Sequence, residues 1–335
     1  MTIALVYRVM DGMVMDVDET HIQQLKQAFP EEDVVFARSM QELKDREIRA
    51  ECIVGGHPTL EAYDGEITFA QYCEWAGTVK WFHTMFTGVD AFVNDAAFSD
   101  YGVKLTNSGG VSAITISEQI MAYALCFARC FPHAFVQKTK HAWVRPTNAD
   151  EVNGKTMGII GLGNIGKATA QKAKAFHMRV LGYKRTPVSL DYVDKLYFGE
   201  DGLLQLLAES DYVVMLLPNT PATYHLMDAA RFAAMKDGAY FINNGRGSCV
   251  DTEALIDALR NGKLAGAALD ALDPEPLPAA SPLWEMDNVI LTAHYGGDGQ
   301  HTFHRSIELF IQNMKSYRAG APMKNEIDLR SYMAH

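Results

Sequence analysis

The chain has 335 residues, and this length favours two domains because single hydrophobic cores stop growing at about 250–300 residues. Hydrophobic residues make up 48% and charged residues 21%, which is an ordinary globular composition. The net charge of −11 without a long basic run argues against nucleic acid as a partner, and no apolar run approaches the ~20 residues of a membrane span.

The N-terminal stretch and the cysteines indicate a cytoplasmic protein. Residues 1–12 lack the charged start and the small-residue cleavage site of a signal peptide, so we expect a first strand there. No histidine accompanies the cysteines at metal-ligand spacing. Reduced core thiols are therefore a better interpretation than a metal site or a disulfide. The cysteines are Cys52, Cys73, Cys126, Cys130 and Cys249.

Short apolar runs alternate with helical patterns along the chain, which predicts parallel sheets covered by helices on both faces. The first strands are expected at residues 2–7, 33–38, 52–56, 79–86 and 103–107. Helices are expected between them at residues 23–29, 41–44 and 69–76. These elements form a small α/β unit that ends near Leu105, and a long helix follows over residues 116–130.

A second series of strands is expected at residues 157–161, 179–183, 212–217, 239–244, 265–272 and 288–294. Helical patterns follow several of them, at residues 167–176, 229–236 and 252–262. Six parallel strands that begin with a glycine-rich turn predict a doubly wound nucleotide-binding domain. The last helix, 301–317, is expected to return to the first unit. The predicted domains are residues 1–104 with 297–335, and residues 105–296.

The turn after the first strand of this second series fits the G-x-G-x-x-G pattern with Gly161, Gly163 and Gly166. The three glycines permit a tight turn, close approach of a pyrophosphate, and close packing of helix on strand. The amides of Asn164 and Ile165 would open the helix and point at the phosphates. A plain strand-to-helix turn is the alternative, but the flanking strand and helix patterns favour a dinucleotide site.

The end of the next strand lacks the acidic residue that usually binds the adenosine ribose. Residues 181–188 contain no acid, and Asp191 lies too far along the turn. Lys184 and Arg185 would attract a 2′-phosphate, and the Thr186 hydroxyl could donate to it. We therefore predict that NADP(H) is preferred over NAD(H). The alternative is that the basic pair is solvated and the enzyme accepts NADH.

Three side chains that could take part in catalysis follow later strands of this series: Arg246, Glu275 and His294. They are separated by 275 − 246 = 29 and 294 − 275 = 19 positions. Ligands bind at the carboxyl ends of the strands in open α/β sheets, so we expect these three residues to share one site. Each alone could be a turn residue, a loop charge or a buried histidine.

Taken together, these motifs resemble the D-isomer-specific 2-hydroxyacid dehydrogenase family. The arginine stands in an N-x-x-R-G turn at residues 243–247, and the glutamate precedes Pro276 in a D-x-x-x-x-E-P stretch. The histidine is followed by Tyr295-Gly296-Gly297, and residues 216–247 resemble the family signature over their length. The match is weaker in the first hundred residues, where 86–88 and 107–110 depart from the family patterns.

The resemblance implies a flavodoxin-like substrate domain that is split around a Rossmann dinucleotide-binding domain. It implies hydride transfer between a nicotinamide dinucleotide and a small 2-oxo acid, giving the D-2-hydroxy acid. Arg246 would hold the carboxylate and polarise the ketone. His294 would donate the proton, and Glu275 would fix the imidazole tautomer and raise its pKa.

The family pattern also extends to residues around these three. Asp270 would hold the nicotinamide carboxamide, and groups near Asn244 and Pro218 would line the same face of the cofactor. Amides near Gly55, Thr87 and Gly88 would hold the substrate carboxylate. The family usually forms homodimers through its nucleotide domain, and residues 141–146 are a candidate arm.

Other features have ordinary interpretations, and other functions remain open. Trp143 and the cluster Trp81-Phe82-Phe86 are interpreted as packing residues. A dinucleotide-sensing binding protein of the corepressor type would keep the same three residues and turn over weakly. Family members that oxidise formate replace the glutamate with glutamine, so Glu275 argues against that reaction.

Overall fold

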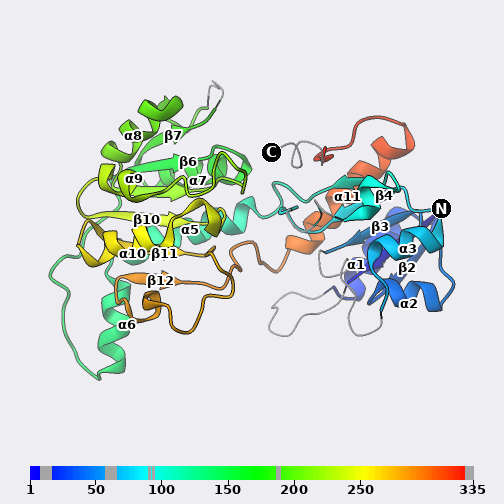
Figure 1. Cartoon of the computed structure of the whole chain (residues 1–335), viewed down its shortest axis with the longest axis horizontal. Helices are drawn as coiled ribbons and strands as arrows, with labels where there is room; N and C mark the ends of the chain where they lie inside the picture. Colours follow the sequence, from blue (N-terminus) through cyan, green and yellow to red (C-terminus); the bar gives the residue numbers. More distant parts are fainter. Residues whose placement is uncertain (8–16, 57–65, 90–91, 93–94, 186–189, 329–335) are drawn as a thin grey trace. The chain divides into compact units, whose positions relative to one another are not determined.

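The structure is a computed structural model, and it describes residues 1–7, 17–56, 66–89, 92, 95–185 and 190–328. The chain divides into two compact units, residues 1–112 with 298–335 and residues 113–297. We call them unit 1 and unit 2. The sequence placed the boundaries after residues 104 and 296. Both units are parallel α/β sheets, as expected (Figure 1).

Unit 1 has a five-stranded sheet with the flavodoxin-like order β2-β1-β3-β4-β5. Every neighbouring pair is parallel. Its strands are β1 (Thr2–Val6), β2 (Asp33–Ala37), β3 (Cys52–Gly55), β4 (Trp81–Thr84) and β5 (Lys104–Thr106). Its helices are α1 (Glu19–Ala28), α2 (Met40–Asp45), α3 (Phe69–Ala76), α4 (Ala96–Ser99) and α11 (Thr302–Arg318).

Successive strand residues of unit 1 enter different cores, as the two-residue period of a strand requires. Ile3 packs with α1 and α11, whereas Ala4 packs with α2 and α3. Helix α11 comes from the C-terminal end of the chain and buries Phe303, Ile307 and Phe310 on the α1 side. The chain therefore returns to its first unit, as the sequence predicted.

Unit 2 has a seven-stranded sheet in the order β12-β11-β10-β9-β6-β7-β8, which is the doubly wound dinucleotide-binding order extended by one strand. Its strands are β6 (Thr156–Ile160), β7 (Arg179–Tyr183), β8 (Lys195–Tyr197), β9 (Tyr212–Met215), β10 (Ala239–Asn243), β11 (Leu264–Leu269) and β12 (Val289–Leu291). The sequence predicted six strands and missed β8, because its residues Lys195, Leu196 and Tyr197 begin with an exposed lysine and form no apolar run.

The helices of unit 2 cover both faces of its sheet (Figure 1). They are α5 (Ala113–Ala128), α6 (Phe131–Thr139), α7 (Asn164–Ala175), α8 (Gly199–Glu209), α9 (Ala229–Ala234) and α10 (Thr252–Arg260). Helix α5 ends two residues before the predicted limit, and Cys130 adopts a left-handed φ of 57° before α6 begins. Two short 3-10 turns are η3 (Gly247–Cys249) and η4 (Pro282–Glu285).

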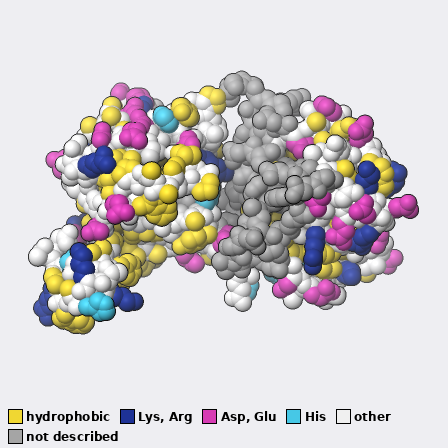
Figure 2. Space-filling model, turned by 60° about the horizontal axis from the view of Figure 1, so that its bottom comes forward, with side chains coloured by type: hydrophobic (Ala, Val, Ile, Leu, Met, Phe, Trp, Pro, Cys, Tyr) yellow, Lys and Arg dark blue, Asp and Glu magenta, His cyan; other side chains and the backbone are white. Residues whose placement is uncertain are grey.

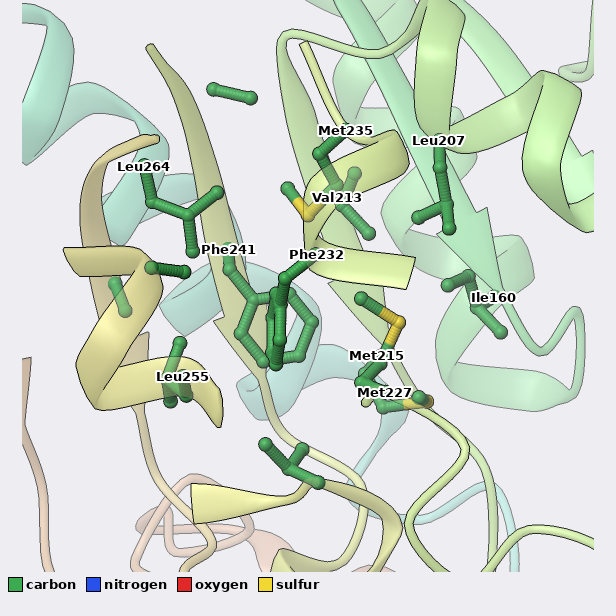
Figure 3. Packing of buried hydrophobic residues seen from close by; sticks show 14 of the residues in the cluster. Ile160, Leu207, Val213, Met215, Met227, Phe232, Met235, Phe241, Leu255 and Leu264 are labelled. Carbon is green, nitrogen blue, oxygen red and sulfur yellow. The ribbon is translucent and has the colours of Figure 1, made fainter. Parts of the chain in front are cut away.

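Two apolar cores hold the sheet of unit 2 between these helices. On the side of α8, α9 and α10, Phe232 meets Phe241 edge to face at 5.3 Å, with Met215 and Met227 beside them (Figure 3). The opposite core is shared by α5, α7 and the alternate strand residues. Burying a side chain of this size contributes about 1.5–3 kcal/mol, so the sheet is a rigid base for the loops at its carboxyl edge.

Candidate active site

The glycine turn joins β6 to α7 in the way that a dinucleotide pocket requires. Gly161 has φ +107°, and a Cβ on it would lie 3.0 Å from the Leu216 carbonyl oxygen. A Cβ on Gly166 would lie 2.2 Å from the Gly161 carbonyl oxygen, so both positions are closed to side chains. A Cβ on Gly163 would meet nothing within 4 Å. The turn therefore has no space for a side chain at Gly161 or Gly166, whereas the space beside Gly163 is open.

Gly163 is the N-cap of α7, and no side chain caps this end of the helix. The first N–H groups of a helix lack intrahelical acceptors, and the helix dipole favours an anion beside them. Asn164 and Ile165 are the first two residues of α7, where the sequence placed them. These features fit the pyrophosphate of a dinucleotide.

The basic pair follows β7 at the same edge of the sheet. Lys184 is half-buried and its N–H donates to the Tyr197 carbonyl at 3.3 Å, while Arg185 is exposed. Neither side chain forms an ion pair with any residue that the structure describes. Thr186, the third predicted residue, lies outside the described residues. The two cations are thus not neutralised by a described carboxylate.

Arg246 stands in a turn that a buried asparagine holds together. The Asn243 side chain donates to the carbonyls of Arg246 at 3.2 Å and Ala271 at 3.0 Å, and it accepts from the Gly245 N–H at 3.0 Å. A Cβ on Gly247 would lie 1.8 Å from the Leu272 carbonyl oxygen. The N-x-x-R-G pattern therefore reflects a turn that packs directly against the chain after β11.

Glu275 and His294 are in direct contact. One Glu275 oxygen lies 2.8 Å from Nδ1 of His294, and the other accepts the Leu272 N–H at 2.7 Å. His294 has φ +53°, an uncommon value for a non-glycine residue, which turns its ring toward Glu275. Nε2 of His294 has no hydrogen bond to a described residue, and the side chain is 46% exposed. One ring nitrogen is thus held by Glu275, while the other has no described partner.

The charges around this pair favour an imidazolium beside a carboxylate. The hydrogen bond to Glu275 raises the pKa of His294, and this outweighs burial and the positive charge of Arg246, which both lower it. Burial raises the pKa of Glu275, but the hydrogen bonds from His294 and the Leu272 N–H, with the charges of His294 and Arg246, bring it below its usual range. Arg246 is thus close enough to act electrostatically on both residues.

A buried polar network lies behind His294, and the sequence predicted only part of it. Asp270 is 5% exposed and accepts from the Thr292 hydroxyl at 2.6 Å and from the Gln119 amide at 3.3 Å through the same oxygen. Its other oxygen accepts the Gly296 N–H at 3.0 Å. Asn244 donates to Gln119 at 2.8 Å, and its own side-chain oxygen is buried without a described partner.

The network also includes the Tyr123 hydroxyl, 2.6 Å from the Thr292 hydroxyl. Asp270 and Asn244 were predicted as cofactor residues, whereas Gln119, Tyr123 and Thr292 were not recognised. Gln119 and Tyr123 are one helical turn apart on α5, so they share one face of the helix. Two polar residues at this spacing in an apolar helix are the signal that could have identified them.

Pro218 follows β9, and its carbonyl accepts from the Thr223 hydroxyl at 2.6 Å. In unit 1, Gly55 ends β3, and its carbonyl accepts the Met85 N–H at 2.8 Å. The Thr87 carbonyl accepts from the Asn107 amide at 2.6 Å, and Gly88 is half-buried. Two adjacent parallel strands thus bring these residues to the carboxyl edge of the sheet of unit 1: β3 ends at Gly55, and Thr87 and Gly88 follow β4.

The aromatic residues that were predicted to pack have different environments. Trp81 and Phe82 are fully buried, and Phe86 meets Phe303 edge to face at 6.1 Å. The prediction was wrong for Trp143, which is fully exposed in the segment after α6. That segment follows a helix with no buried residue, so it has no core to enter.

The described residues also bear on metal sites, membrane spans and disulfides. Within the described residues, no group of three or more His, Cys, Asp and Glu side chains could hold a metal ion. In the same part of the chain, no helix combines the length and apolar character needed to cross a membrane. None of the five cysteines, which all lie in the described part of the chain, is in a disulfide, and four of them are buried.

Comparisons with known proteins agree with this geometry. The profile of the D-isomer specific 2-hydroxyacid dehydrogenase NAD binding domain matches residues 121–296. The glyoxylate/hydroxypyruvate reductase B of Citrobacter koseri is 35% identical over 249 residues, which are 72% of this chain and 76% of that protein.

Solved structures match both units. A D-isomer specific 2-hydroxyacid dehydrogenase family protein from Aeromonas salmonicida has a TM-score of 0.81 at 28% identity, and the match covers 98% of this chain and 99% of that one. A D-isomer specific 2-hydroxyacid dehydrogenase from Xanthobacter autotrophicus, solved with NADPH and MES, has a TM-score of 0.78 at 30% identity, with 98% of each chain covered. The chain therefore belongs to the D-isomer specific 2-hydroxyacid dehydrogenase family and is an NAD(P)-dependent 2-hydroxyacid dehydrogenase.

Proposed function

We propose that the protein reduces a small 2-oxo acid to the D-2-hydroxy acid, with NADPH as the preferred reductant. The observation that carries this proposal is the 2.8 Å contact between Glu275 and His294 within the electrostatic reach of Arg246. A relative named for glyoxylate and hydroxypyruvate reduction supports short 2-oxo acids as substrates. Residues 1–104 with 297–335 are assigned to the substrate, and residues 105–296 to the dinucleotide.

Glu275 and His294 are assigned the proton transfer. Glu275 accepts from Nδ1, so Nε2 of His294 is left to donate a proton to the ketone oxygen of the substrate. In the direction of oxidation, the same nitrogen accepts the proton from the hydroxyl group. The bound nicotinamide supplies the hydride in one direction and accepts it in the other.

Arg246 is assigned the binding and polarisation of the substrate. Its planar guanidinium can donate to a carboxylate and to the neighbouring ketone oxygen at the same time. Negative charge develops on the ketone oxygen as the reaction proceeds, and a fixed cation there stabilises the transition state more than the ground state. In unit 1, backbone amides near Gly55, Thr87 and Gly88 would hold the substrate carboxylate.

The dinucleotide is assigned to the edge of the unit 2 sheet. Gly161, Gly163 and Gly166 with the amides of Asn164 and Ile165 would bind its pyrophosphate. Asp270, Asn244 and the chain near Pro218 would line the nicotinamide. The unpartnered side-chain oxygen of Asn244 supports this, because buried acceptors usually have a donor.

The preference for NADPH rests on Lys184 and Arg185, with Thr186 as a third candidate. A 2′-phosphate carries negative charge that two cations without a described carboxylate partner would attract. The test is the ratio of kcat/KM for NADPH to that for NADH in the wild type and in Lys184→Asp and Arg185→Ala. We expect the ratio to fall in both variants, and an unchanged ratio would contradict this assignment.

A homodimer through the nucleotide-binding unit is part of the proposal. Phe131 and Phe135 stack with their ring centroids 6.0 Å apart while 45% and 62% exposed, and Trp143 is fully exposed. The projecting part of this unit shows hydrophobic side chains next to Lys and Arg (Figure 2). We expect sedimentation to show a dimer that weakens in Trp143→Ser. Five cysteines outside any disulfide support a cytoplasmic location.

The function is tested by NADPH oxidation with a panel of 2-oxo acids that includes glyoxylate and hydroxypyruvate. Chiral analysis of the product then decides whether the D-hydroxy acid forms. The control is His294→Asn, because asparagine tolerates the left-handed φ at this position and transfers no proton. Activity that this variant retains in full would contradict the role of His294, and no turnover with any acid would contradict the function.

A further inference from the structure

The turn that carries His294 is held from both sides by one carboxylate. Asp270 accepts from the Thr292 hydroxyl at 2.6 Å with one oxygen and from the Gly296 N–H at 3.0 Å with the other. These residues stand two positions before and two positions after His294. Asp270 thus joins the two flanks of a turn whose central residue has φ +53°. Such a left-handed conformation persists only when surrounding contacts enforce it.

Gln119 on α5 lies against Asp270 and both flanks of the turn, Thr292 and Gly296. Its amide nitrogen lies 3.3 Å from Asp270 and 3.4 Å from the Thr292 hydroxyl. Its oxygen accepts from Asn244 at 2.8 Å. A Cβ built on Gly296 would lie 2.1 Å from the same oxygen, so Gln119 packs directly against the backbone of the turn.

The carboxylate of Asp270 also sets the direction of each hydrogen bond. An ionised carboxylate only accepts, so Gln119 must present its NH₂ group to Asp270 and its oxygen to Asn244. The Thr292 hydroxyl likewise donates to Asp270, and Tyr123 must then donate to Thr292. Two series of hydrogen bonds therefore run from α5 to the same Asp270 oxygen, one from Gln119 and one from Tyr123 through Thr292. The donor and the acceptor of each hydrogen bond in the network are thus fixed.

We propose that Gln119 is a positioning residue for His294, which it holds in place through Asp270 and the 292–296 turn, with Tyr123 in a smaller supporting role. The proposal rests on the proposed function, in which His294 transfers the proton. Gln119 contacts Asp270 and Asn244, whereas the described contacts of His294 are with Glu275. Its effect on catalysis is thus indirect.

The test compares Gln119→Met, Tyr123→Phe and the control Glu118→Gln in the full-length protein. Methionine keeps the length of glutamine but cannot donate to Asp270. Glu118 is next to Gln119 on α5, but its side chain is 62% exposed, and its ion pair among the described residues is with Lys172, at 3.9 Å. The control therefore changes the same helix without touching the network.

Three quantities are measured: kcat across pH, the dissociation constant of NADPH from protein fluorescence, and the titration of the His294 ring by NMR. The His294 signal is identified by its absence from His294→Asn. Glu275, Arg246 and Asp270 are the charged groups that act on the His294 ring, and none of them is altered. The ring titration needs no cofactor, so it tests the positioning independently of turnover.

We expect Gln119→Met to lower kcat by roughly tenfold, because a displacement of about 1 Å in an active site can cost up to 100-fold. The His294 pKa should fall toward its ordinary value as the ring loses its fixed contact with Glu275, and Tyr123→Phe should show a smaller fall. Weaker NADPH binding with unchanged kcat and ring pKa would overturn the proposal. If Gln119→Met fails to fold, an unchanged pKa of the His294 ring in Tyr123→Phe would also overturn the proposal. No turnover in the wild type contradicts the function instead.

Discussion

A histidine of each unit lies near the carboxyl end of a strand, and these two histidines, His83 and His294, have opposite environments. His83 on β4 of unit 1 is fully buried among hydroxyl groups, 2.7 Å from Thr106 and 3.3 Å from Ser108, and burial lowers its pKa to about 3. His294 after β12 is half exposed, and its hydrogen bond to Glu275 raises its pKa. A neutral, sealed imidazole can only stabilise the fold, whereas an accessible imidazolium can deliver a proton.

The comparison teaches that a strand-end position does not make a histidine catalytic. Solvent access and a charged partner decide the protonation state of the ring. Burial without a neighbouring charge favours the neutral imidazole, whereas a neighbouring carboxylate favours the imidazolium. The sequence selected His294 by its relation to Arg246 and Glu275. The predictions below separate the two roles.

The largest effect is expected at His294. His294→Asn should lower kcat by ~10²–10⁴-fold, because it removes the proton donor and retains a residue that tolerates the left-handed backbone. Steady-state kinetics with the best 2-oxo acid measures this loss. At alkaline pH, where the imidazolium no longer contributes, the melting temperature should stay near the wild-type value. A kcat within threefold of the wild type would place the proton donor elsewhere.

Glu275→Gln should have the next largest effect, about 10-fold or more on kcat at alkaline pH. In the proposed function the reduction needs protonated His294, so activity should fall as pH rises through the His294 pKa. Removing the carboxylate lowers this pKa toward its ordinary value, and the fall in activity should therefore move to lower pH. The pH profile of kcat in the wild type and the variant measures the movement. A shift to higher pH would contradict the contact seen here.

His83→Ala should act on stability instead of chemistry. The variant leaves a cavity in unit 1 and removes a hydrogen-bond partner of Thr106 and Ser108, at a cost of about 2–4 kcal/mol in the free energy of unfolding. Denaturant unfolding measures this cost, and kcat per folded molecule should change little. A large loss of kcat in a stable variant would give His83 a catalytic part.

The smallest effect is the pH dependence of stability, which should have opposite signs for the two histidines. The His83 pKa is about 3 in the folded protein and ordinary when unfolded, so stability falls as pH falls from about 6.5 toward 3. The His294 pKa is raised, so its contribution is complete below about 6.5 and is lost as pH rises through the folded pKa.

Unfolding midpoints across pH in the wild type, His83→Ala and His294→Asn measure both contributions. We expect His83→Ala to be less sensitive to acid than the wild type. His294→Asn should lose stability mainly below about pH 6.5, where the imidazolium contributes. Parallel curves for all three proteins would show that neither histidine changes its pKa on folding.

The sequence determined the fold class, the glycine turn and the three strand-end residues, because these depend on local requirements. Alternating apolar residues define strands, and Gly161 and Gly166 are required where the backbone itself leaves no space for a side chain. The N-x-x-R-G pattern around Arg246 has the same origin.

The tertiary structure decided what depends on residues far apart in the chain. Gln119 meets Asp270 across 151 positions, and Tyr123 meets Thr292 across 169. The periodicity of the sequence does not indicate such pairs, because their side chains become neighbours only when α5 packs against the sheet. The same holds for the short strand β8 and for the exposure of Trp143. Short sequence patterns specify local geometry, whereas the contacts around the turn of His294 form only when the chain has folded.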